Sequence, residues 1–113
     1  MNISCVILNY NDADTTINLI DEIKDYSNLD HIIIVDNLST DNSFGKLKEK
    51  ESTKVTVIHS DKNGGYGYGN NIGIKKAHND FHSDYIIIAN PDVHFTEKNI
   101  QTMAEELEYN KET

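Results

Sequence analysis

The stretch HIIIVD, His31–Asp36, decides the fold class of this 113-residue chain. Its apolar residues follow one another without alternation, so the strand that they predict is buried on both faces. A strand of this kind is typical of a parallel sheet that is covered by helices on both sides. The run is also far shorter than the roughly 18–20 apolar residues that a membrane helix needs.

Three further strand-length runs lie on either side of this stretch, at Ile3–Leu8, Lys54–His59 and Asp84–Asn90. A segment with helical spacing of its apolar residues, Thr15–Tyr26, separates the first two strands. Strands that alternate with helices predict the α/β class. We therefore expect a Rossmann-like parallel sheet with helices on both faces, in a single domain over residues 1–113.

The other helices are predicted from caps and spacing. The segment STDNSFGKLKEK supplies N-cap residues for a short charged helix, and NNIGIKKAHN carries Ile72 and Ala77 on one face of another. The last helix is expected over Glu97–Tyr109. Its inward residues are predicted to be Ile100, Met103, Ala104 and Leu107.

The charge balance limits the class of ligand. The chain has a net charge of -9 and contains no arginine, which argues against a nucleic-acid partner. A diphosphate ligand would need backbone N–H groups, a metal ion or a nearby lysine to offset its charge. A single cysteine, Cys5, lies in an apolar strand and is expected to be buried and inert, and the N-terminal residues do not resemble a signal peptide. These features predict a cytoplasmic protein.

Polar residues follow every predicted strand. They are Asn9–Asp12, Asp36–Asn37, Ser60–Gly65 and Asn90–Asp92. Ligands of parallel sheets bind outside the carboxyl ends of the strands, so these residues are candidates for a shared site. Asn, Asp and Gly are also ordinary turn formers, which leaves a purely structural interpretation open for each turn.

The stretch NGGYGYGNNIG, Asn63–Gly73, holds five of the six glycines. It is no P-loop, and it only loosely resembles the dinucleotide fingerprint, which belongs after the first strand. We interpret it as backbone that comes close to a ligand, with Tyr66 and Tyr68 as stacking or wall residues. The alternative is an irregular loop with no ligand.

The turn Asn90-Pro91-Asp92 presents two side-chain oxygens, and Pro91 stiffens it. Oxygen ligands, completed by phosphates, suit Mg²⁺ or Mn²⁺. Asn-Pro-Asp is also a common turn without metal. His94 and Lys62 could reach a metal or a phosphate, although a solvated or packed side chain explains both.

Four motifs, taken in order, resemble the nucleotide-binding half of family-2 glycosyltransferases, and most of all its rhamnosyltransferase-like members. They are VILNYND, IIIVDNLSTDNS, NGGYGYGNNIGIKKA and YIIIANPDVHF. The resemblance covers nearly the whole chain. It implies a GT-A fold, a nucleoside-diphosphate sugar donor, a divalent metal and inverting transfer to an acceptor hydroxyl in polysaccharide or glycan biosynthesis.

The resemblance also assigns roles to residues. Asn9 and Tyr10 would line the base pocket, and Asp36 would hydrogen-bond the base or the ribose. The nucleotide and sugar pocket would be shaped by Asn63, Gly64, Gly65 and Asn70. Asn90-Pro91-Asp92 would replace the usual Asp-x-Asp motif, with Asp92 as the metal ligand and Asn90 as a donor-binding residue that departs from the family pattern.

The resemblance also implies a donor, an acceptor and a general base. The donor would be a dTDP-, UDP- or GDP-linked sugar, and a C-terminal half would bind a glycan or lipid-linked acceptor and carry the general base. We therefore expect that the 113 residues alone do not transfer sugar. We also expect the full-length protein to be peripheral to a membrane, and an apolar flank of the half-sheet to favour a homo-oligomer.

Two other functions remain open from the sequence. One is a non-catalytic module that binds nucleotide sugars, and the other is a flavodoxin-like or receiver-like interaction domain. A receiver needs an acidic pair after its first strand and an aspartate after its third. Here Asn9-Tyr10-Asn11 and His59-Ser60 occupy those places, although Asp12 and Asp61 lie nearby.

Overall fold

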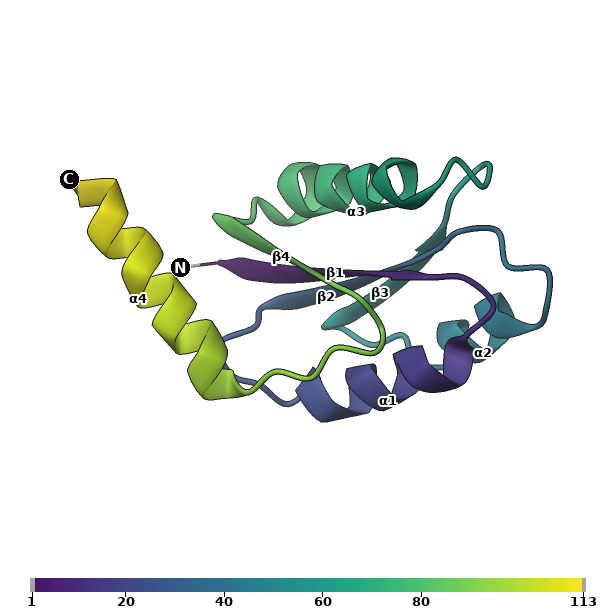
Figure 1. Cartoon of the computed structure of the whole chain (residues 1–113), viewed down its shortest axis with the longest axis horizontal. Helices are drawn as coiled ribbons and strands as arrows, with labels where there is room; N and C mark the ends of the chain where they lie inside the picture. The colour runs from purple at the N-terminus through teal and green to yellow at the C-terminus, as the bar shows by residue number, and fades with distance from the viewer. Residues whose placement is uncertain (1, 113) are drawn as a thin grey trace.

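The computed structural model describes the backbone of residues 2–112 and the side chains of residues 2–106. Within this range, strands and helices alternate along the chain (Figure 1). The elements are β1 (Ile3–Asn9), α1 (Ala13–Ile23), β2 (His31–Asp36), α2 (Ser43–Lys48), β3 (Val55–His59), α3 (Tyr66–Phe81), β4 (Tyr85–Ala89) and α4 (Glu97–Glu112). No helix in this part of the chain is both long and apolar enough to cross a bilayer.

The four strands form one parallel sheet in the order β3-β2-β1-β4. β1 is central, with Cys5 paired to Ile32 of β2 on one side and to Ile87 of β4 on the other. The predicted α/β class and parallel sheet are confirmed. All four strands end at the same edge, so the segments that follow them are brought together there.

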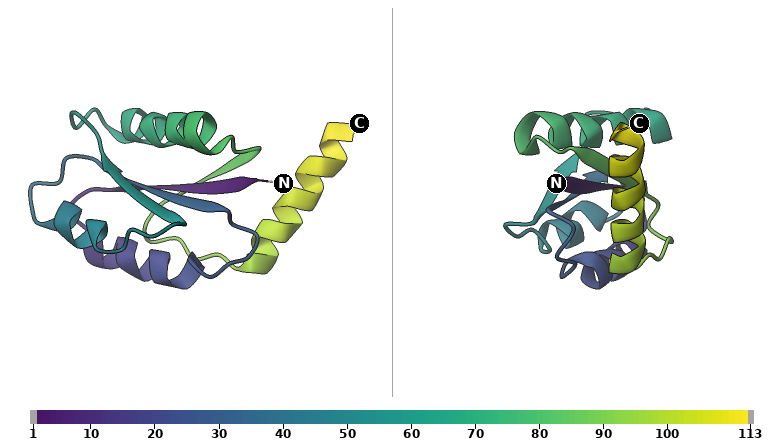
Figure 2. Two further views of the ribbon diagram at one scale, coloured as in Figure 1. Left: turned by 180° about the vertical axis from the view of Figure 1, so that it is seen from behind. Right: turned by 90° about the vertical axis from the view of Figure 1, so that its left-hand side faces the viewer.

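Helices cover both faces of the sheet (Figures 1 and 2). α3 packs on one face against Val6, Ile33 and Val35. α1, α2 and the start of α4 lie on the other face, around a larger apolar cluster. Alternate residues of each central strand belong to alternate clusters, as the period of a strand requires. This explains the uninterrupted apolar run of β2.

Several predicted boundaries and orientations were wrong. α1 begins at Ala13 rather than Thr15, and α3 begins at Tyr66, inside the glycine stretch. In α4, Ile100 is buried as predicted, but Met103 is 43% exposed because the helix extends away from the sheet (Figure 1). The side chain of Leu107, also predicted to point inward, lies outside the described side chains.

Cys5 is completely buried in β1, and this burial raises the pKa of its thiol to about 12. Because the thiolate is the reactive form, we expect the folded protein not to react with a disulfide reagent such as DTNB at pH 8. The thiol should react fully in urea, where its pKa returns to the ordinary value. Following the absorbance of the released thiolate with and without urea checks this expectation, and rapid reaction of the folded protein would contradict it.

Candidate functional site

The ends of β1 and β2 are joined by a buried polar network. Asn9 and Asp36 are register partners, and Asn9 Nδ2 donates to Asp36 Oδ1 over 3.0 Å. The Thr16 hydroxyl of α1 donates to Asn9 Oδ1 over 2.6 Å. Since Oδ1 of Asn9 is held by Thr16, its Nδ2 must face the carboxylate. Both predicted site residues are therefore fixed before any ligand arrives.

Ser39 donates two further hydrogen bonds to Asp36. Its backbone N–H donates to Asp36 Oδ2 over 3.0 Å, and its hydroxyl donates to Oδ1 over 2.6 Å. Asp36 is only 2% exposed, so its charge is balanced by hydrogen bonds rather than by water. Each carboxylate oxygen has two lone pairs, so Oδ2 can still accept a bond from a ligand.

The loops that follow β1 and β2 are also tied to each other. The Asn11 backbone N–H donates to the Ser39 hydroxyl over 2.8 Å, and Asn11 Oδ1 accepts from the backbone N–H of Thr40 over 2.8 Å. Tyr10 follows β1 directly, is 46% exposed and lies at the surface of this edge. Its predicted contact with a base stays a prediction.

A second polar group links the ends of β2 and β3. Asn37 Nδ2 donates to Asn63 Oδ1 over 3.0 Å, and the Ser60 hydroxyl lies 3.2 Å from Asn37 Oδ1. The structure therefore brings the predicted Asn63 to the end of β2. Sequence reasoning gave no separate role to Ser60, Asn37, Ser39 or Thr16, all of which join the predicted residues together.

Two glycines of the stretch, Gly69 and Gly73, are needed for packing. A Cβ at Gly73 would lie 2.4 Å from Val6 Cγ1, and one at Gly69 would lie 2.4 Å from Leu8 Cδ1. These glycines allow α3 to approach its own sheet, so packing alone explains both, and the close approach of the stretch to a ligand stays a prediction. Gly65 is required for another reason, because its φ of +92° is strained for other residues.

The two tyrosines of the stretch have separate partners. The Tyr68 hydroxyl donates to Asp61, which holds the pKa of that carboxyl below its ordinary value. Lys62 Nζ lies 4.8 Å from the centre of the Tyr68 ring. The Tyr66 hydroxyl instead donates to Asn90 Oδ1 over 2.9 Å, which joins the start of α3 to the end of β4.

Asn70 carries a polar atom that no other described residue satisfies. The residue is 5% exposed, and its buried Oδ1 has no hydrogen-bond partner among the described residues. A buried acceptor without a partner is costly, and a water or a ligand could satisfy it. The predicted place of Asn70 in the nucleotide pocket stays a prediction.

The Asn90-Pro91-Asp92 turn contains one carboxylate, that of Asp92. A bond from the Val93 N–H to the Asn90 carbonyl, 3.0 Å long, closes the turn, and Asp92 is exposed. Among the described residues, no group of three or more His, Cys, Asp or Glu could hold a metal ion. His94 contacts Glu22, with 2.9 Å between Nδ1 and Oε2. The residues present fit a cation only if a bound diphosphate supplies most of its ligands.

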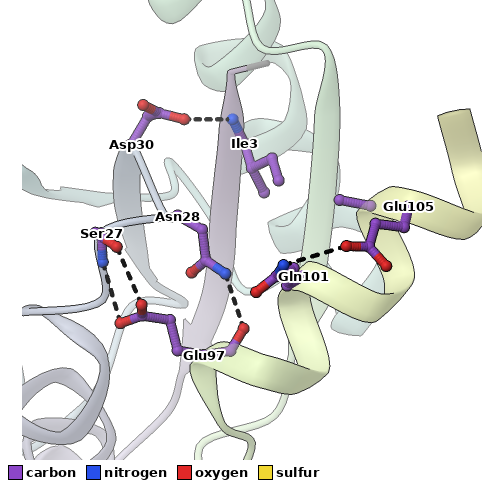
Figure 3. Close-up of a pocket in the computed structure, with 8 residues that line it drawn as sticks. Ile3, Ser27, Asn28, Asp30, Glu97, Gln101 and Glu105 are labelled. Atoms are coloured by element: carbon purple, nitrogen blue, oxygen red, sulfur yellow. Dashed lines mark hydrogen bonds between the residues drawn. The ribbon is translucent and has the colours of Figure 1, made fainter.

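A cavity of about 460 Å³ lies at the opposite, amino-terminal edge of the sheet (Figure 3). Three of its lining residues are acids, and each has a structural partner. Glu97 accepts from Ser27, Asp30 accepts from the Ile3 N–H, and Glu105 accepts from Gln101. These carboxylates disfavour a diphosphate and instead fix α4 and β1 in place, so the candidate site remains at the carboxyl edge.

Comparisons with known proteins bear on the family of this chain. A family profile described as Glycosyl transferase family 2 matches residues 4–113. A search of curated proteins found no match. The chain is similar to S. aureus TarS in complex with UDP, with a TM-score of 0.78 and 18% identity over 96% of this chain and 32% of that one.

A second similar structure is the mannosyltransferase PcManGT from Pyrobaculum calidifontis in complex with GDP-Man and Mn²⁺. It shares 17% identity, with a TM-score of 0.69, over 80% of this chain and 27% of that one. At these identities the likeness shows the fold, a GT-A type of parallel sheet. The chain spans about a third of the length of the solved relatives. Because the family profile covers almost all of its residues, the chain belongs to glycosyl transferase family 2.

Proposed function

We propose that this chain forms the donor-binding part of an inverting glycosyltransferase. The enzyme would transfer the sugar of a nucleoside-diphosphate sugar to a hydroxyl of a glycan or lipid-linked acceptor. Rhamnose is the first candidate for that sugar. The observation that carries the proposal is the set of polar side chains from all four strand ends at one edge of the sheet, in a chain of this family.

The buried network offers acceptors that suit a nucleoside. The remaining lone pairs of Asp36 can accept from a base N–H or a ribose hydroxyl, with Asn9 and Tyr10 beside them. The orphan Oδ1 of Asn70 is a further acceptor for a hydroxyl. We place the base near Asp36 and the rest of the donor towards Asn63, Gly64 and Gly65.

The diphosphate must be stabilised without arginine. First-turn N–H groups of a helix have no acceptor within the helix and favour anions, and the first turn of α3 lies next to the Asn90 turn through Tyr66. We propose that Asp92 holds Mn²⁺ or Mg²⁺ together with the phosphates. The ion would supply Lewis-acid stabilisation of the charge that develops on the departing diphosphate. The Mn²⁺ in the mannosyltransferase structure supports this choice.

Titration calorimetry with UDP, dTDP and GDP tests the proposal. We expect one nucleotide to bind more tightly with Mn²⁺ than with EDTA, and Asp92→Ala to abolish the gain from the metal. Asp25→Ala removes another exposed acid, after α1, and should leave the gain unchanged. Absence of binding for all three nucleotides would contradict the proposal.

A non-catalytic module that binds nucleotide sugars is the second candidate. It is favoured by Asn90, which leaves a single carboxylate in the turn. A catalytic protein would convert donor and acceptor into product when the full-length chain is supplied. A module of the second kind would bind the donor and never turn it over.

A further inference from the structure

The two edges of the sheet are protected to different degrees. β3 forms one edge, and residues that precede it in the chain cap its outer side. The Val57 N–H donates to Glu51 Oε2 over 3.0 Å, and the Val55 N–H donates to the Ser52 hydroxyl over 3.1 Å. The Ser52 N–H in turn donates to the Val55 carbonyl over 3.0 Å. A strand edge that is capped in this way is closed to further pairing.

β4 forms the other edge, and its outer side is open (Figure 1). The Tyr85 N–H donates to the Asn2 carbonyl, so the peptide groups of Tyr85 and of Ile87 point towards β1. These directions alternate along a strand, so the peptide groups of Ile86 and Ile88 point away from the sheet. Among the described residues, no strand lies beyond β4, and no side chain caps these two outward groups.

The apolar side chains of β4 are also incompletely covered. The run Ile32–Ile34 of β2 is completely buried, whereas Ile86 and Ile87 are only half-buried and Ile88 is 40% exposed. A groove of about 430 Å³ is lined by these isoleucines of β4 and by Met103 of α4, which is 43% exposed. A strand edge that is both open and apolar favours pairing with another strand.

The capped edge at β3 restricts which strand can fill this place. A second copy of the chain cannot offer β3, because its own residues occupy the outer side of that strand. The second copy can offer β4. When both copies use the same strand, the contact closes a dimer about a two-fold axis and does not continue as a filament.

The outward peptide groups determine the register of such a pair. In an antiparallel pair, two residues that both present outward groups exchange two hydrogen bonds. Ile86 of each copy therefore lies opposite Ile88 of the other, and Ile87 lies opposite itself. Asp84, just before β4, then lies opposite the neutral amide of Asn90, just after it. A parallel arrangement would instead place Asp84 beside the Asp84 of the second copy, where like charges repel.

We propose that β4 pairs antiparallel with β4 of a second copy, with Ile87 at the two-fold axis, so that two chains form one continuous sheet. The second copy would cover Ile88 and satisfy the outward peptide groups of the strand. This inference is independent of the proposed donor site.

Sedimentation velocity over a range of protein concentrations tests the pairing. We expect a species of about twice the 12.8 kDa mass of the chain. Ile88→Lys places a charge in the contact once from each copy, and should weaken self-association at least about tenfold. Thr56→Lys adds the same charge to β3, on the same face of the sheet, and should leave the dimer intact. Circular dichroism and thermal melting check that both variants fold.

Single cysteines test the register. Ile87→Cys places two thiols across the axis in a non-hydrogen-bonded pair, where Cα atoms lie about 4.5 Å apart and a disulfide can form. Ile88→Cys is the matched control, because its Cα atoms would lie diagonally, about 7–8 Å apart. Mild oxidation should link the Ile87→Cys chains faster, although Ile88 is the more exposed position. Cys5 is completely buried and should take no part. Gels run without a reducing agent measure the linked fraction.

The outcomes decide the proposal in separate steps. A monomer at every concentration would show that the edge has another occupant, such as a following segment of a longer chain, and would overturn the pairing. A dimer that Ile88→Lys leaves intact would place the contact on another surface. Faster linkage of Ile88→Cys than of Ile87→Cys would contradict the register with Ile87 at the axis.

Discussion

Replacing Gly73 with alanine is expected to lower the free energy of unfolding by about 1–3 kcal/mol. The added Cβ would lie 2.4 Å from Val6 Cγ1 and 3.1 Å from Val35 Cγ2, so α3 must shift away from the sheet. Both valines are fully buried and cannot move aside. Urea unfolding followed by circular dichroism measures the change.

Gly67 provides the matched control, because it lies in the same helix and a Cβ added there would meet nothing within 4 Å. Alanine is the better helix former, so Gly67→Ala should raise the free energy of unfolding by up to about 1 kcal/mol. The two identical substitutions should therefore have opposite signs. A stabilising Gly73→Ala would show that α3 does not need its close approach to β1.

Replacing Asp36 with alanine is expected to cost about 3 kcal/mol in stability and to abolish nucleotide binding. The change leaves the Asn9 amide and the Ser39 N–H without their acceptor, and an unsatisfied buried donor costs roughly 1–3 kcal/mol. Urea unfolding reports the stability, and calorimetry with the nucleotide that binds the unaltered protein reports the site.

Asp61→Ala is the control for this substitution. Asp61 is an exposed acid after the neighbouring strand β3, and its loss should change stability by less than about 0.5 kcal/mol. Ser39→Ala should fall between the two variants, because it removes one hydroxyl bond to Asp36 and keeps the bond from the backbone. An Asp36→Ala protein as stable as Asp61→Ala would contradict the structural role of the network.

The fold class and the sequence of strands and helices along the chain could be predicted because the strands carry a strong local signal. His31–Asp36 is apolar on both faces, and only a parallel sheet with two helical layers buries both. The start of α3 could not be predicted in the same way. Glycine disfavours a helix locally, and the contacts that require Gly69 and Gly73, with Leu8 and Val6, are distant in sequence.

The candidate site was predictable in position and less so in its contacts. The rule for parallel strands identified Asn9, Asp36 and Asn90 by their places at strand ends. Their partners depend on how side chains meet across loops, as Tyr66 and Asn90 do over 24 positions of sequence. A local signal did exist for Ser39, because a serine three residues after an aspartate is a common turn that satisfies the carboxylate.

The order of the strands has a consequence for how the protein is made. Of the four strands, β1 is synthesised first and lies inside the sheet, but its partner β4 is synthesised last, with Ile3 paired to Tyr85. One edge of β1, a largely apolar strand, therefore stays unpaired until the other three strands have been translated. Contacts between residues so far apart in sequence slow folding and leave strand edges exposed to aggregation. In a nascent chain of this protein, that edge of β1 therefore stays unpaired until β4 has emerged.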